Sequence, residues 1–158
     1  MKESLRTGIS FGLTSGVITT LGLMVGLNSG THSRPVVLGG ILTIAIADAF
    51  SDAIGIHISE ESKKGQSEKH IWAATLSTFL SKLLFALTFV VPVLLFELYT
   101  AILVSVAWGF SVLAILSYKI AAYQGAKPWK VVTEHLFIAL VVITITHFVG
   151  NWIGIVCN

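Results

Sequence analysis

Five long apolar runs alternate with short polar segments along this chain. A helix needs about 20 residues to cross the hydrocarbon core of a bilayer at 1.5 Å per residue, and each run is long enough. The runs occupy residues 8–27, 36–59, 71–96, 100–123 and 134–156. The pattern therefore predicts an all-α integral membrane protein with five transmembrane helices, one membrane domain over residues 1–158 and a short cytoplasmic loop at 60–70.

The polar segments between the runs differ in charge from one side of the predicted membrane to the other. With five crossings, one side holds most of the basic residues: Lys2, Arg6, Lys63, Lys64, Lys69, Lys119, Lys127 and Lys130. The loops on the other side hold only Arg34. Because cytoplasmic loops are enriched in Lys and Arg, we expect a cytoplasmic N-terminus and a C-terminus outside the cell or in an organelle lumen.

Composition agrees with a membrane protein and argues against several functions. The chain is 54% hydrophobic and 11% charged, with a mean hydropathy of +0.86, whereas soluble domains have about 25% charged residues. A net charge of +2 is too small to predict nucleic-acid binding. Cys157 is the only cysteine, and we find no nucleophile–base pair or phosphate-binding glycine loop. We expect the lipid bilayer as a partner, no enzyme activity and no tightly bound cofactor.

Two aspartates, Asp48 and Asp52, interrupt the second apolar run. They are four residues apart, so they lie on one face of a helix. Counted from the cytoplasmic end near Ser59, Asp52 and Asp48 lie roughly 10 and 16 Å deep. An aspartate at the bilayer centre costs about 3 kcal/mol even on the most lenient scale, so the two carboxylates need a partner, a proton or a bound cation.

Lys82 is the obvious protein partner, because it lies about 16 Å into the third run, close to the depth of Asp48. One interpretation is a structural Asp–Lys pair that holds two helices together. One lysine does not neutralise two aspartates, however, and the surplus carboxylate favours a second cation or an exchangeable proton. The sequence leaves both interpretations open.

The first and last runs contribute further polar candidates. Ser15 is a candidate hydroxyl ligand beside Asp48 and Asp52, and it lies among glycines whose four-residue spacing mainly indicates close helix packing. His147, in the last run, is a candidate proton relay or metal ligand. A hydrogen-bonded packing role is the favoured interpretation for this histidine.

Acidic and imidazole side chains also gather at the predicted cytoplasmic end of the second and third runs. His57, Glu60 and Glu61 share a helical face, and Glu68 and His70 follow in the sequence. They could collect a divalent cation at a cytoplasmic mouth. A charge-balanced, solvated turn is an equally good interpretation, because lysines lie among the acids.

Four stretches in order along the chain resemble the vacuolar iron transporter family. They are the glycine-rich stretch 11–27, the stretch 39–62 with Ser51-Asp-Ala-Ile-Gly-Ile-His-Ile-Ser59, the segment Thr78-Phe-Leu-Ser81 with Pro92 beyond it, and Thr146-His-Phe-Val-Gly-Asn-Trp-Ile-Gly154. The resemblance implies five transmembrane helices, a cytoplasmic N-terminus and a homodimer. It also implies export of Fe²⁺ or Mn²⁺ from the cytoplasm in exchange for protons.

The chain departs from this family at the positions that matter for an ion. Ser15 stands where the family has an aspartate, Asp52 where it has a methionine, and Lys82 where it has an aromatic residue. The long acidic insertion of the family is reduced to the short loop around Glu60, Glu61 and Glu68.

An all-oxygen site favours Mn²⁺ or Fe²⁺ over copper or zinc. We therefore predict a divalent cation transporter with Asp52, Asp48 and Ser15 at the ion and Glu60 and Glu61 at the entrance. We expect Asp52 to be the main ligand of the ion, because it lies at the family's ion-path position. Asp48 is the residue that we expect to be more structural. The alternative is a non-transporting membrane scaffold or metal sensor with a structural Asp–Lys network.

Overall fold

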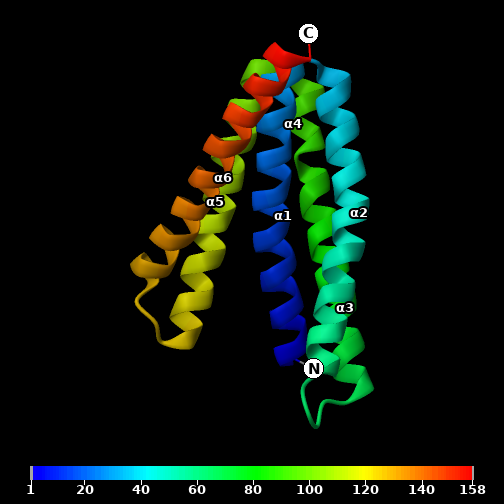
Figure 1. The fold of residues 1–158 in the computed structure, drawn as a ribbon. Helices are drawn as coiled ribbons and strands as arrows, with labels where there is room; N and C mark the ends of the chain where they lie inside the picture. Colours follow the sequence, from blue (N-terminus) through cyan, green and yellow to red (C-terminus); the bar gives the residue numbers. More distant parts are fainter. Residues whose placement is uncertain (1, 158) are drawn as a thin grey trace.

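A computed structural model describes residues 2–157, and Figure 1 shows that these residues fold as a bundle of long helices. The helices are α1 (Lys2–Thr31), α2 (Arg34–Glu61), α3 (Glu68–Thr88), α4 (Val90–Leu95), α5 (Leu98–Gln124) and α6 (Pro128–Val156). The described part of the chain contains no strand. Five helical segments are long and apolar enough to cross a membrane, with α3 and α4 forming one of them. The fold is compatible with the predicted multi-pass membrane protein.

Helix α1 occupies the centre of the bundle. It packs on α2 and α3 on one side and on α5 and α6 on the other (Figure 1). The two ends of the chain lie at opposite ends of the bundle, and the α2–α3 and α5–α6 turns lie at the same end as the start of α1. The basic residues of these three segments therefore share one end, as the charge pattern predicts.

Several helices extend beyond the predicted apolar runs, and α1, predicted at 8–27, spans Lys2–Thr31. Because α2 continues through Glu61 and α3 begins at Glu68, the loop between them is 62–67 rather than 60–70. Ser67 caps α3 by accepting a hydrogen bond from the backbone N–H of His70. Helix α6 begins at Pro128, so the predicted start at Glu134 is two turns too late. Polar first turns hide such helix starts from a hydropathy pattern.

The third predicted helix is broken rather than continuous. Helix α3 ends at Thr88, Phe89 forms a turn, and α4 begins at Val90. Pro92 explains the break, because it has no N–H to donate to the carbonyl four residues earlier and its ring crowds that carbonyl. Thr88 is the residue whose carbonyl loses this partner.

The glycines of α1 allow unusually close helix contacts, as their spacing indicates. A Cβ atom on Gly12 would lie 2.2 Å from Ser81 Oγ and 2.6 Å from the carbonyl oxygen of Thr78. Further along α1, a Cβ atom on Gly26 would lie 3.3 Å from the carbonyl oxygen of Thr146. The first half of α1 thus packs closely on α3, and the second half packs closely on α6.

We expect Gly12→Ala to destabilise the protein by about 1–3 kcal/mol, because the added methyl group meets the α3 backbone and forces α1 and α3 apart. Thermal unfolding in detergent measures the change. Gly55→Ala is the matched control, since a Cβ atom on Gly55 meets nothing within 4 Å. Equal unfolding temperatures for the two variants would show that close α1–α3 packing is not required.

Candidate functional site

The buried Lys82 side chain joins three helices at one point. Its ammonium nitrogen, Nζ, lies 2.5 Å from Asp48 Oδ2, donates a hydrogen bond to Asp52 Oδ2, and donates another to Ser15 Oγ at 2.8 Å. Ser15 belongs to α1, the aspartates to α2 and the lysine to α3. The structure therefore brings together the four residues that the sequence suggested separately.

The two carboxylates interact with the ammonium group in different ways. Asp52 Oδ2 accepts a hydrogen bond from Nζ, whereas Asp48 Oδ2 is within ion-pair distance but accepts no hydrogen bond from the described residues. Both carboxylates therefore share the ammonium group, and the directed hydrogen bond to Asp52 adds to its charge interaction.

Small residues make room for this cluster. A Cβ atom on Gly16 would lie 3.3 Å from Lys82 Cγ, so the glycine lets the lysine stem pass close to α1. Ala45, Ala49 and Ala53 are the buried residues of α2 around the aspartates. Because the alanine side chains are short, the polar groups of α2 and α3 approach one another without a bulky side chain between them.

The cluster is enclosed around the ammonium group and open at the carboxylates. The Lys82 side chain is 2% exposed, whereas those of Asp48 and Asp52 are 24% and 19% exposed. Two carboxylates share one ammonium group, which leaves one formal negative charge in excess when all three are ionised. The excess negative charge thus lies at the exposed edge of the cluster.

A divalent ion here would be held by carboxylate and hydroxyl oxygens only. No group of three or more His, Cys, Asp or Glu side chains suited to a metal occurs among residues 2–157. Asp48, Asp52 and Ser15 supply three oxygens of the hard type that suits Mn²⁺ or Fe²⁺. The Lys82 ammonium already lies among these oxygens, so a metal ion must displace it to bind all three.

The predicted cytoplasmic mouth does not form one cluster. Glu60 is 3% exposed and pairs with Lys63 at 2.6 Å and with His70 at 3.4 Å, while His57 forms a 3.0 Å hydrogen bond with Thr75. Glu61 and Glu68 are exposed on the surface. Glu60 thus interacts within the α2–α3 turn. His57, Glu60 and Glu61 do not converge on one point where they could bind an ion together.

His147 takes part in a local hydrogen-bond network at the opposite end of the bundle. Its Nδ1 lies 2.6 Å from Ser29 Oγ, and its Nε2 lies 3.2 Å from Asn151 Nδ2. Both ring nitrogens of His147 therefore have a side-chain partner, one on α1 and one a turn further along α6. This geometry agrees with the packing interpretation. Nothing in the sequence identified Ser29 as the partner, because it lies 118 residues away.

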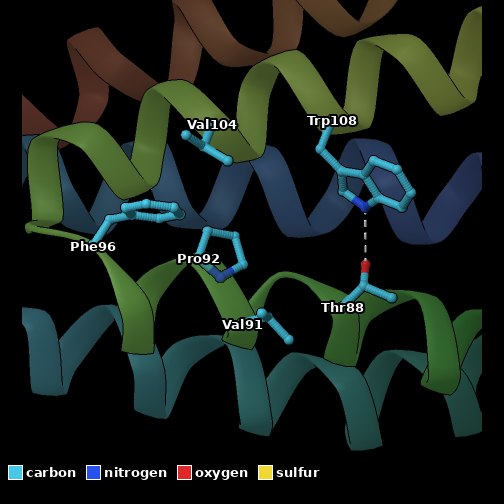
Figure 2. Close-up of a pocket in the computed structure, with 6 residues that line it drawn as sticks. All are labelled: Thr88, Val91, Pro92, Phe96, Val104 and Trp108. Carbon is cyan, nitrogen blue, oxygen red and sulfur yellow. Dashed lines mark hydrogen bonds between the residues drawn. The ribbon is translucent and has the colours of Figure 1, made fainter.

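A separate pocket between α4 and α5 has no ionic character (Figure 2). It has a volume of about 330 Å³ and is lined by Thr88, Val91, Pro92, Phe96, Val104 and Trp108. Figure 2 shows its one polar contact, a 3.1 Å hydrogen bond from the Trp108 indole N–H to the Thr88 hydroxyl. Without an ionisable side chain, this pocket is not a site for a cation.

Comparison of the chain with known protein families gives no match, and comparison with curated proteins gives none either. The chemistry of the Asp48–Asp52–Lys82–Ser15 cluster therefore carries the functional argument.

Proposed function

We propose that this chain is a proton-coupled transporter, like the vacuolar iron transporters, that exports Fe²⁺ or Mn²⁺ from the cytoplasm. The observation that supports the proposal is the charge of the cluster: Asp48 and Asp52 share the single ammonium group of Lys82. In helices long and apolar enough to cross a membrane, an ionisable residue is by default a sign of ion handling. The excess negative charge then has a use, which is to bind a cation or a proton reversibly.

Competition between metal and proton gives the coupling. Carboxylates that have lost their protons bind the metal ion on the cytoplasmic side, and protons from the other side displace it, because both compete for the same oxygens. Asp52 and Asp48 act as ligands or proton carriers, and Ser15 is an auxiliary ligand. Lys82 acts as an internal cation that leaves the oxygens when the metal binds and returns when it departs.

The proposal includes a topology and an assembly. The basic end of the bundle faces the cytoplasm, because it holds the lysines and arginines of α1 and of the two turns. A homodimer is proposed from the family resemblance. The exposed edges of Asp48 and Asp52 lie on the outer surface of the single chain, where a second copy can cover them.

Metal-dependent proton flux in liposomes tests the function. We expect Asp52→Asn to reduce the flux at least tenfold and Asp48→Asn to reduce it less, because Asp52 has the directed hydrogen bond to Lys82. Glu134→Gln is the matched control, since Glu134 is an exposed acid of α6 outside the cluster. Unchanged flux in both aspartate variants would refute the assignment of the ion to this cluster.

The second candidate function is a non-transporting membrane scaffold or metal sensor. The observation that favours it is the enclosure of Lys82, which already has two carboxylates and a hydroxyl as partners. On this view the cluster is a structural network, and Lys82→Met combined with Asp48→Asn leaves the protein folded and able to bind its partner. Absence of metal-dependent flux in the wild-type protein would favour this candidate over the transporter.

A further inference from the structure

A cleft separates the start of α1 from the end of α5 at the basic end of the bundle. Two adjoining cavities of about 720 and 460 Å³ form it, and both are lined by Arg6, Ser10, Ile120 and Tyr123. Figure 1 shows the α5–α6 pair leaning away from α1 toward this end. The cleft lies between α1 and α5, whereas the Asp–Lys cluster lies among α1, α2 and α3.

The rim of the cleft is polar and positively charged. Arg6 of α1 lies over the ring of Tyr123 of α5, with its guanidinium carbon 3.4 Å from the ring centroid. Lys119 of α5 lines the same cleft, and Glu3 is the one acid that lines it. Neither Arg6 nor Lys119 forms an ion pair with the residues that the structure describes. The rim therefore has a net charge of one positive unit, and neither of its two cations is paired with an acid in the described part of the chain.

The walls of the cleft become apolar away from the rim. Ile9, Leu116 and Ile120 line it. Phe11 also lines it, one helical turn further along α1 than the polar Thr7. Beyond these residues the two helices close on one another at Gly109 of α5, where a Cβ atom would lie 2.6 Å from Leu21 of α1. The cleft thus ends where α1 and α5 meet. It has cationic residues at its mouth and apolar residues on its inner walls, and it is open along its side.

We propose that this cleft binds one anionic phospholipid, with its phosphate at Arg6 and Lys119 and an acyl chain between α1 and α5. Basic pockets between membrane helices bind anionic headgroups, and the apolar walls match the hydrocarbon. A zwitterionic lipid also offers a phosphate, but its own headgroup cation cancels that charge and leaves the excess positive charge of the cleft unmatched. A free phosphate leaves the apolar walls uncovered. Charge complementarity therefore selects an anionic amphiphile. The inference is independent of whether the chain transports a metal.

Native mass spectrometry of the detergent-solubilised protein tests the proposal with phosphatidylglycerol and phosphatidylcholine as probes. We expect the wild-type protein to bind phosphatidylglycerol about tenfold more tightly than phosphatidylcholine, because each basic residue near the headgroup adds to the attraction. Arg6→Gln/Lys119→Gln is expected to lose this preference. Lys64→Gln/Lys69→Gln is the matched control, since it removes the same charge from exposed residues of the α2–α3 segment.

Each alternative occupant gives a distinct result. Equal loss of preference in the two double variants would overturn the site, because it would show a general charge effect. Inorganic phosphate competing as well as phosphatidylglycerol would overturn the role of the acyl chain. A change of oligomeric state in Arg6→Gln/Lys119→Gln, with phosphatidylglycerol binding intact, would assign the cleft to a second copy. If Arg6→Gln disturbs folding, Lys119→Gln alone carries the test, and an unchanged lipid preference in it would overturn the proposal.

Discussion

Replacing Lys82 by methionine is expected to destabilise the protein by about 3–5 kcal/mol, because removing one partner of a buried ion pair leaves its counter-charges uncompensated. The substitution leaves Asp48 and Asp52 side by side on α2 with no cation between them. Methionine keeps most of the length and volume of the lysine stem, so the loss reports on charge rather than on packing. Thermal unfolding in detergent measures it.

Neutralising the aspartates should reverse most of this loss. The triple variant Lys82→Met/Asp48→Asn/Asp52→Asn carries no charge in the cluster, and replacing a whole buried ionic group by neutral residues is often close to neutral in stability. Lys69→Met is the matched control, since Lys69 is exposed at the start of α3. A Lys82→Met variant as stable as the Lys69→Met variant would contradict the view that the ammonium group holds α2 and α3 together.

Helix length, charge distribution and depth were sufficient to predict the main features of this site. Apolar runs of 20 residues or more specify membrane-length helices, and equal depth in adjacent helices predicted that Lys82 meets Asp48. The alternative of a structural network already placed Asp48, Asp52 and Lys82 together, but the sequence did not decide whether one ammonium group contacts both carboxylates. That contact depends on the rotation of α3 about its axis, which a sequence pattern does not give. Gly12 and Gly16 let α3 and the Lys82 stem approach α1 closely.

The parts that could not be predicted depend on contacts between residues far apart in the sequence or on local turn geometry. Glu60 has the sequence context of a solvated acid, yet the α2–α3 turn folds Lys63 and His70 over it and leaves it 3% exposed. His147 meets Ser29 only because Gly26 and Gly150 let α1 and α6 approach closely. The break at Phe89 depends on Pro92, which lies within an otherwise uninterrupted apolar run.

The position of Lys82 connects stability with ion binding. Its ammonium group occupies the place among Asp48, Asp52 and Ser15 that a metal ion needs, so the wild-type protein can bind a metal there only by moving the lysine. The stability that Lys82 supplies is then also the barrier to metal binding. A protein that only needs a structural network has no reason to weaken this contact, whereas a transporter must be able to exchange the ammonium group for another cation.

Mn²⁺ is therefore expected to stabilise the Lys82→Met variant strongly, because this substitution leaves the three oxygens without their ammonium partner. At free Mn²⁺ of about 100 times the dissociation constant, the expected gain is about 2.7 kcal/mol, seen as a rise in unfolding temperature with Mn²⁺ concentration. The triple variant Lys82→Met/Asp48→Asn/Asp52→Asn is the control, since it lacks the carboxylates that bind the metal. No difference between these two variants would show that the cluster is not a divalent cation site.

The response of the wild-type protein to Mn²⁺ separates the two candidate functions. If the cluster belongs to a proton-coupled transporter, the wild-type protein is also stabilised by Mn²⁺, at higher concentrations than Lys82→Met, because the ion must first displace the ammonium group. Lower pH then weakens the effect, since protons compete for the carboxylate oxygens. If the cluster is a structural network, Mn²⁺ stabilises Lys82→Met alone, because the wild-type lysine does not give up its place.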